Sequence, residues 1–290
     1  MTGVDVTPLT SHLGARVDGV DVAAGLGRTE ADEICRALLD HQVLVFPGQR
    51  LTSVEQRDFA RIFGEPQPYP VAALFGDFET VIVIDNQLIA PPSDADEQTA
   101  AYLSDDDAWH TDYTFNREIP SVGTLRAEVV PEVGGDTVWA STYAAYEALS
   151  PVMQRILADL SAVHWSGPLF ARNFGLDRFG PDAQQRFDEE FPPRRHPVVI
   201  THPETGRPAL FVNPSYTTHI VGMTRAESRN LLQFLFRHLI TPAFLFRHHW
   251  SPDDLVVWDE RSTVHLAPTD FQPARRRLIR VAAGSTVPSR

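Results

Sequence analysis

Apolar positions in this chain gather in short runs that are separated by turns rich in Pro, Gly and Asp. Runs of this kind, with many β-branched side chains and turn residues at both ends, predict strands rather than helices. We expect strands at residues 43–46, 80–84, 123–130, 197–201, 209–212, 254–258 and 277–283. Several of these runs lie far apart in the sequence, so much of the strand pairing must be long-range.

Longer stretches with helical spacing of apolar residues are fewer. One helix is expected from Ala31 to about Asp40, directly before the first strand. Thr52 with Glu55, and Thr224 with Glu227, fit the S/T-x-x-E capping box that begins a helix. The second box is followed by an apolar stripe that we expect to face inward, made of Leu231, Leu235 and Leu239.

Many short strands with a few helices predict a mainly β fold with flanking helices, either a β-sandwich or a jelly roll. No repeat, low-complexity block or linker divides the chain, so we expect one domain over residues 1–290. The stretch 166–195 is rich in Phe, Arg, Asp and Pro and predicts a long excursion from the core. Long loops in compact domains often act as lids or binding loops.

Composition narrows the class of protein. Hydrophobic residues make up 43% of the chain, which is typical of a globular core, and the formal net charge of −13 disfavours a nucleic-acid partner. We find no apolar run long enough to cross a membrane and no leader at Met1, and expect a cytoplasmic protein. All 25 basic residues are arginine, so any anion held by a basic side chain is held by guanidinium, and the single Cys35 excludes an internal disulfide.

Candidate chemistry begins with DAWHTDYTF, where His110 and Asp112 stand two positions apart. On a strand these side chains would project from the same face, which suits two ligands of one metal ion. An ordinary His–Asp hydrogen bond fits the same spacing. His265 follows an apolar strand and a turn, and Arg276 and Arg280 share one face of the last predicted strand. Two arginines facing inward would require an anion, unless that face is exposed or paired with acids.

Together these residues resemble the TauD/TfdA family of non-haem iron(II), 2-oxoglutarate-dependent dioxygenases. The family motifs W-H-x-D, G-G-D-T and W-D-N-R-x-x-x-H, followed by an arginine, correspond here to residues 109–112, 134–137, 258–265 and Arg276. The resemblance implies a double-stranded β-helix, that is a jelly-roll core, and a two-His-one-carboxylate iron(II) site. The iron ligands it implies are His110, Asp112 and His265.

The resemblance also implies the co-substrates, 2-oxoglutarate and O2. The far carboxylate of 2-oxoglutarate would pair with Arg276, and the Thr137 hydroxyl would be a second donor. The family reaction couples the decarboxylation of 2-oxoglutarate to succinate with hydroxylation of a substrate C–H bond. A hydroxylated carbon beside a heteroatom then cleaves.

The substrate is less well defined. Related enzymes use the arginine at the Arg280 position to bind an anionic group, so we expect a small, anionic organic substrate. Where taurine enzymes carry a histidine, a tyrosine and an asparagine, this chain has Tyr69, Ala72 and Asp106, so taurine is not the expected substrate. An aromatic wall would suit a larger acid such as an aryloxyalkanoate, a longer sulfonate or an alkyl sulfate, and its expected members are Tyr69, Phe170 and Phe211.

Two alternatives stay open. If Asp106 faces the pocket, an amine-bearing or amino-acid-derived intermediate becomes the expected substrate of the same chemistry. A non-catalytic jelly-roll binding protein is the alternative from another class. Glu260 stands in a turn where the family has an asparagine. We expect this replacement to leave iron binding intact. Changed hydrogen bonds around the metal ligands stay open as an alternative. A homodimer or homotetramer is expected from the family.

Overall fold

The computed structural model describes residues 3–87, 108–166 and 179–290. The strands of this part are β1 (Asp5–Pro8), β2 (Ala15–Asp18), β3 (Val43–Phe46), β4 (Pro66–Gln67), β5 (Val81–Asp85), β6 (Val122–Val129), β7 (Thr137–Ser141), β8 (Ser161–His164), β9 (Arg194–Pro197), β10 (Val199–Thr201), β11 (Pro208–Leu210), β12 (Thr217–Ile220), β13 (Leu245–His248), β14 (Leu255–Asp259), β15 (Thr263–Leu266) and β16 (Arg277–Ala283). The helices are α1 (Arg28–His41), α2 (Ser53–Ala60), α3 (Pro70–Leu74), α5 (Thr142–Glu147), α6 (Pro151–Leu157), α8 (Ala183–Glu190) and α9 (Arg225–Leu239), with 3-10 turns at Arg61–Phe63 and Pro242–Phe244.

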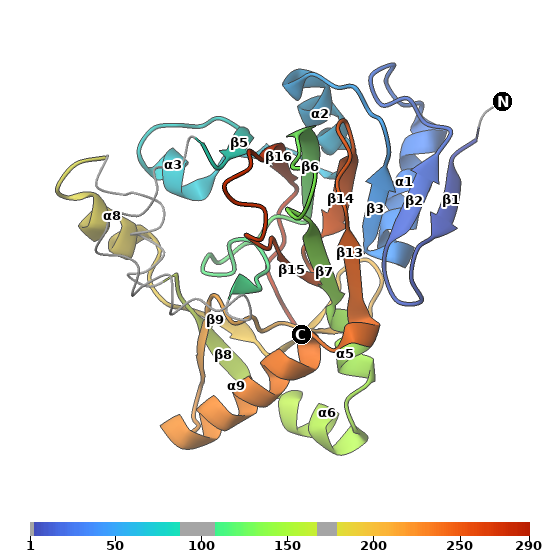
Figure 1. The fold of residues 1–290 in the computed structure, drawn as a ribbon. Coiled ribbons are helices and arrows are strands. Elements are labelled where there is room, and N and C mark those ends of the chain that lie inside the picture. Colours follow the sequence, from blue (N-terminus) through green and yellow to red (C-terminus); the bar gives the residue numbers. More distant parts are fainter. Residues whose placement is uncertain (1–2, 88–107, 167–178) are drawn as a thin grey trace.

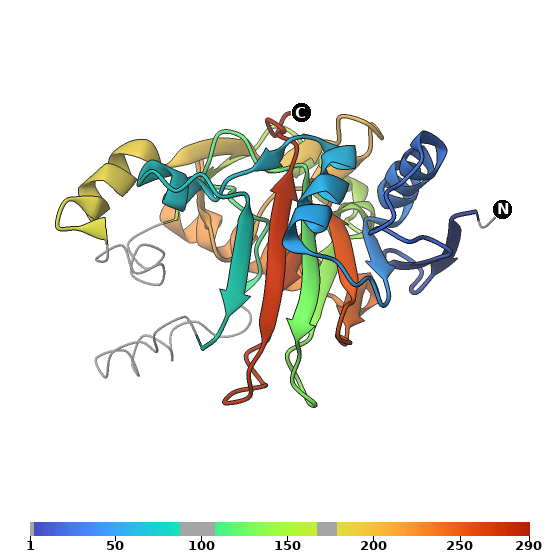
Figure 2. The same cartoon turned by 90° about the horizontal axis from the view of Figure 1, so that it is seen from above.

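The largest sheet has eight strands, in the order β1-β2-β3-β14-β6-β16-β4, and β5 pairs with β16 as well. Its long central strands run side by side in Figure 2. All pairs are antiparallel except β2 with β3. The predicted strand at 43–46 and the two at 254–258 and 277–283 are therefore neighbours or near neighbours in one sheet, as long-range pairing required.

A smaller antiparallel sheet, β13-β7-β15, packs on the large sheet (Figure 1). Its Trp139 lies 5.9 Å from Trp258 of the large sheet, measured between ring centroids, and both rings are buried. Val43 and Val45 join this inter-sheet core, whereas Leu44 and Phe46 on the opposite face of β3 pack with α1. Both faces of β3 are covered, which explains its unbroken apolar run. Two packed antiparallel sheets with flanking helices confirm the predicted jelly-roll fold.

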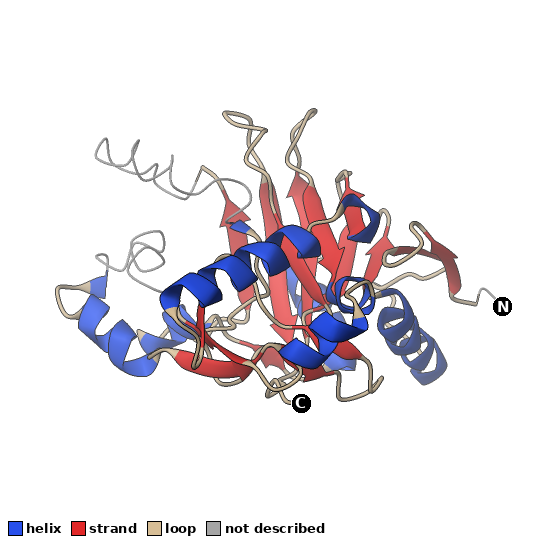
Figure 3. Ribbon diagram, turned by 90° about the horizontal axis from the view of Figure 1, so that it is seen from below, coloured by secondary structure: helices blue, strands red, loops and turns tan. Residues whose placement is uncertain are grey.

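Helices α2 and α9 begin where the two capping signals predicted. Thr52 and Thr224 each accept a hydrogen bond from the backbone N–H of a glutamate three residues on, Glu55 and Glu227, and both capping boxes are complete. In α9 the residues Leu235 and Leu239 are buried as predicted, and Leu231 is half-buried against the same cluster. Figure 3 shows α9 as the long helix lying in front of the strands.

The predicted excursion at 166–195 is only partly described. Helix α8 lies in it, and β9 begins at its end. Phe187 of α8 packs in an aromatic cluster with Phe115 and with Val71 of α3, so α3 and α8 are neighbours (Figure 1). A role of this region as a lid stays a prediction, because residues 167–178 lie outside the described part.

Candidate active site

His110, Asp112 and His265 come together in the structure. One ligand atom from each residue lies within 4.8 Å of the others, and the three are the only group of its kind among the described residues. His110 Nε2 lies 3.6 Å from Asp112 Oδ1, and the two imidazole centroids are 4.3 Å apart. His265, which is distant in the sequence, therefore lies beside the two residues whose spacing suggested a metal site.

The local backbone differs from the prediction of a strand through His110 and Asp112. His110 forms an isolated bridge with His265 of β15, in which the two residues exchange backbone hydrogen bonds of 3.0 and 2.7 Å. The chain then turns, with Tyr113 at a positive φ of 56°. Thr111 Oγ1 donates to the Thr263 carbonyl at 2.7 Å and holds this turn to β15. Bridge and turn, rather than strand alternation, direct both side chains to one point.

The protonation states suit a divalent cation. The Nδ1 of His110 lies 2.8 Å from the Ala108 carbonyl and donates to it, which leaves the lone pair of Nε2 free for a metal. Burial and His110 lower the pKa of His265 to about 3, so its imidazole is neutral, and its buried Nδ1 has no hydrogen-bond partner among the described residues. Burial opposes a charge on Asp112, but the adjacent Arg280 guanidinium outweighs it and holds the pKa of Asp112 well below its usual range.

Neutral imidazoles with one carboxylate are the donor set of a two-His-one-carboxylate iron(II) site, so these three residues fit the metal that the sequence implied. They could hold iron(II) on one side and leave positions open on the other.

Arg276 lies just before β16 and is 6% exposed. Its Nε donates to the Gly135 carbonyl at 2.7 Å, and its Nη2 donates to Thr137 Oγ1 at 3.0 Å. No described carboxylate lies within 4 Å of this guanidinium, and burial lowers its pKa to about 10, so it is still charged near neutral pH. A buried charge without a counter-ion is strongly disfavoured. The residues therefore fit the distal carboxylate of a 2-oxo diacid.

The G-G-D-T segment, residues 134–137, holds Arg276 through two hydrogen bonds. Gly134 and Gly135 both have positive φ, 74° and 70°, which few other residues adopt. Asp270 Oδ1 accepts the Gly135 N–H at 2.9 Å, and the Asp136 carboxylate accepts from Arg247 and from His249. These contacts fix the turn that presents the Gly135 carbonyl to Arg276 and places the Thr137 hydroxyl beside it.

Arg280 was expected to meet a substrate anion. It is buried, and its described partners are Asp112, which accepts from Nη2, and Tyr113, whose hydroxyl accepts from Nη1 at 2.5 Å. Arg280 thus lies directly beside the candidate metal ligands His110, Asp112 and His265, which we call the metal cluster, and the Asp112 carboxylate is its ion-pair partner. Arg280 of β16 and Arg276 directly before it are both buried, which excludes the exposed face that the sequence left open.

Glu260 lies closer to the metal cluster than the sequence suggested. It is in a turn, as predicted, but is fully buried, and its Oε2 accepts the Asp112 N–H at 3.1 Å. Burial and the Asp112 carboxylate hold the pKa of Glu260 well above its usual range, so Glu260 is the neutral member of the pair. The replacement of the family asparagine was the only signal in the sequence.

The residues of the expected aromatic wall lie in different places. Tyr69 packs against Tyr113, with ring centroids 5.6 Å apart. The ring centroid of Tyr216 lies 6.2 Å from that of His110. Sequence reasoning missed Tyr113 and Tyr216, because nothing in the pattern showed which aromatic residues would surround the metal cluster. Phe211 belongs to a separate core cluster and stacks on His164, centroids 5.5 Å apart. Asp106 and Phe170 lie outside the described residues, so their predicted roles stay untested.

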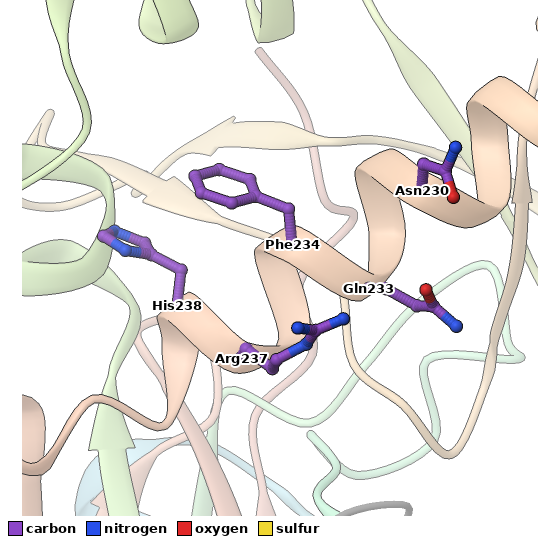
Figure 4. A pocket seen from close by; sticks show the side chains of 5 residues that line it. All are labelled: Asn230, Gln233, Phe234, Arg237 and His238. Carbon is purple, nitrogen blue, oxygen red and sulfur yellow. The ribbon is translucent and has the colours of Figure 1, made fainter.

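A shallow hollow of about 400 Å³ lies on the exposed face of α9. Figure 4 shows the five side chains that line it, all from this helix: Asn230, Gln233, Phe234, Arg237 and His238. It shares no residue with the metal cluster or with the surroundings of Arg276.

A jelly roll that brings two imidazoles and a carboxylate together, with a buried arginine that has no ion-pair partner among the described residues, fits a metal-dependent oxygenase. The comparisons with known proteins agree. Residues 5–282 match the model of the family "Taurine catabolism dioxygenase TauD, TfdA family", and the chain belongs to this family. The dioxygenase class predicted from the sequence is thereby confirmed.

Individual relatives are about equally similar over nearly the whole chain. The chain is 32% identical to an alkylsulfatase of Acinetobacter baylyi over 96% of its own length and 84% of the relative. It is 34% identical to an alpha-ketoglutarate-dependent 2,4-dichlorophenoxyacetate dioxygenase of Cupriavidus pinatubonensis, with 96% of each chain covered. Among solved structures, a taurine dioxygenase from Burkholderia xenovorans superimposes with a TM-score of 0.80 at 32% identity, covering 99% of this chain and 92% of that one.

Proposed function

We propose that this protein hydroxylates a C–H bond of a small anionic organic substrate, using iron(II), O2 and 2-oxoglutarate. The bound iron(II) and 2-oxoglutarate supply the oxidising chemistry: one oxygen atom of O2 enters the substrate and the other enters succinate, with release of CO2. Arg276 carries the proposal, because a buried guanidinium without a carboxylate partner among the described residues needs an anionic ligand.

The residues of the chain have distinct proposed tasks. His110, Asp112 and His265 hold the metal, Arg276 and Thr137 bind the distal carboxylate of 2-oxoglutarate, and a neutral His265 needs no deprotonation before metal binding. The Thr137 oxygen accepts hydrogen bonds from Trp250 Nε1 and Arg276 Nη2, each at 3.0 Å, so its own proton is free to be donated to the carboxylate.

The substrate is proposed as an alkyl sulfate, a sulfonate or an aryloxyalkanoate, with taurine not expected. Relatives are named for the first and last of these classes, which supports this choice. The contacts of Tyr113 with Arg280 and with Tyr69, which set a cation beside aromatic surface, support it as well. Hydroxylation at the carbon that bears the ester or ether oxygen would cleave the product. The amine-bearing alternative depends on Asp106 and stays a prediction.

An anaerobic titration with iron(II) and 2-oxoglutarate tests the class. We expect a weak visible charge-transfer band, followed after admission of O2 by succinate formation that a member of the substrate panel stimulates. Asp112→Ala should show neither. Absence of the band from folded wild-type protein supplied with iron would favour the non-catalytic binding protein.

The location and the oligomeric state of the protein are separate questions. In the part of the chain that the structure describes, no helix has the length and apolar character needed to cross a membrane. A cytoplasmic location and a homodimeric or homotetrameric state stay predictions.

A further inference from the structure

The guanidinium of Arg280 is partly occupied before any substrate arrives. Nη2 donates to Asp112 and Nη1 to the hydroxyl oxygen of Tyr113, and the Arg280 Cζ lies 5.0 Å from the centroid of the Tyr113 ring. Planar carboxylates are bound best by two parallel N–H groups of a guanidinium fork. Because Asp112 and Tyr113 each take an N–H from a different terminal nitrogen, Arg280 does not offer its whole fork to a planar anion.

The Tyr113 hydroxyl still has a proton to give. A phenol carries one O–H donor as well as acceptor lone pairs, and the lone pair of Tyr113 is used by Arg280. No described residue accepts the Tyr113 proton. The side chain is buried, with 7% of the residue exposed, so bulk water does not readily serve as the acceptor. A buried donor next to a buried cation is suited to an anion that touches both.

The backbone holds Tyr113 at this place. Its φ of 56° is uncommon for a residue with a large side chain, and the turn is closed by the Asn116 N–H, which donates to the Tyr113 carbonyl at 2.8 Å. Thr114, the next residue, is held through its hydroxyl, which accepts a hydrogen bond from Asn213 Nδ2 and shares another with His164 Nδ1. The phenol is therefore fixed beside Arg280 by the same turn that carries Asp112.

Apolar surface begins directly beside this pair of donors. The Tyr113 ring packs with Tyr69 and Phe115, at centroid distances of 5.6 and 6.2 Å, and belongs to the aromatic cluster between α3 and α8. An anionic head at Arg280 and Tyr113 would therefore continue into an apolar body.

We propose that Tyr113 is a specificity-determining residue that, with Arg280, binds the anionic head of the substrate and favours a tetrahedral sulfur oxyanion over a planar carboxylate. This proposal rests on the proposed function and deepens it. A sulfate ester or sulfonate presents oxygens in several directions, so it can accept from a phenol and from a remaining N–H of Arg280 that do not lie in one plane. A carboxylate would gain less from such a pair.

The test compares octyl sulfate with nonanoate, two probes that share an alkyl chain and differ in the head group. Binding is measured by anaerobic calorimetry to protein loaded with Mn(II) and 2-oxoglutarate, in which no turnover disturbs the equilibrium. We expect wild type to bind octyl sulfate more tightly. Tyr113→Phe, which keeps the ring and its packing, should weaken octyl sulfate binding roughly 10- to 100-fold, as expected for a lost hydrogen bond to a charged group. Nonanoate binding should change much less.

The control is Tyr143→Phe, which removes another buried hydroxyl whose described partner is Thr205. It should leave both probe affinities unchanged. The affinity for 2-oxoglutarate should stay within about twofold of wild type in Tyr113→Phe.

Three results would overturn the proposal. Equal or tighter octyl sulfate binding by Tyr113→Phe would mean that the phenol only competes for Arg280. A parallel loss of 2-oxoglutarate affinity would mean that the turn as a whole is disturbed. Failure of wild type to bind either probe would remove the anion site, while the iron and 2-oxoglutarate titration would still decide the proposed function independently.

Discussion

Glu260 lies directly behind Asp112 and accepts its backbone N–H at 3.1 Å from a fully buried position. Two buried carboxyl groups in contact cannot both be ionised without a large penalty, and Arg280 stabilises the charge on Asp112. Glu260 therefore acts as a neutral hydrogen-bonding support for the proposed metal ligand. Groups in this position orient the ligand and affect metal affinity.

Glu260→Gln should preserve this support, because the amide keeps the size and the acceptor oxygen of the acid. We expect Mn(II) affinity within about threefold of wild type for Glu260→Gln, and a loss of roughly 10- to 100-fold for Glu260→Leu, which removes the acceptor. Anaerobic metal titration of both variants gives the comparison. Equal affinities of Glu260→Leu and wild type would show that the contact does not position Asp112.

Arg276 and its neighbour Arg277 should respond to replacement in opposite ways. Arg276→Met removes a buried charge with no described carboxylate partner, so the stability of the ligand-free protein should be unchanged or higher. The affinity for 2-oxoglutarate should fall by about 2–5 kcal/mol, the usual effect of truncating one partner of a buried charge pair. Thermal unfolding and 2-oxoglutarate titration measure the two effects.

Arg277→Met is the matched control. Arg277 donates to Glu128 at 2.7 Å and to Asp85 at 3.2 Å, so its loss should lower stability and leave 2-oxoglutarate binding nearly unchanged. If both variants lost 2-oxoglutarate binding equally, the assignment of Arg276 would be wrong.

Gly135→Ala should disturb the same site through the backbone. An added Cβ would meet Pro131 Cγ at 2.8 Å and Arg276 Cδ at 3.2 Å, so the proline must shift and the arginine must give by a few tenths of an ångström. We expect weaker 2-oxoglutarate binding, by roughly tenfold or more, since small displacements of positioned groups have large effects. Gly222→Ala has a similarly positive φ, 83°, but open space around the added atom. Gly222→Ala should lower stability through backbone strain but leave 2-oxoglutarate binding unchanged. An equal loss of 2-oxoglutarate binding in both variants would show that backbone strain, and not displacement of Arg276, causes the loss.

The buried Asp259 carboxylate should make the free energy of unfolding sensitive to acid. Burial opposes its charge, but Arg261 and His202 outweigh burial and lower its pKa to about 2. Because the pKa is lower in the folded than in the unfolded state, this stabilisation is present above about pH 4 and is lost as the pH falls toward 2. Asp259→Asn should therefore be less stable than wild type by roughly 2–4 kcal/mol at pH 7, with the difference shrinking below pH 4.

Denaturant unfolding between pH 2 and pH 7 measures this difference, with Asp18→Asn as the control. Asp18 forms an exposed ion pair with Arg16 at 2.7 Å, and exposed pairs contribute less than about 1 kcal/mol. A difference between Asp259→Asn and wild type that does not depend on pH would contradict the lowered pKa.

The sequence predicted the fold well because its strands are signalled locally. Runs such as 43–46 and 254–258 are apolar on both faces in a fold that covers both faces, and both capping boxes begin helices as expected. Motif spacing selected His110, Asp112 and His265, which the structure brings together, and Arg276, which it buries. The contact of Glu260 with Asp112 was not predicted, because a turn residue carries no periodic signal that reports its burial. The positive φ of Tyr113 likewise has no signature in an aromatic residue.

The bridge between His110 and His265 has a consequence for how the protein acquires its metal. These residues are far apart in the chain, and His265 lies on β15, which pairs with β7 in the small sheet. A chain still emerging from the ribosome therefore lacks a complete ligand set until its last strands have been made. Binding of iron by all three residues requires that His265 has been brought beside His110, and bound metal will favour this folded arrangement by mass action.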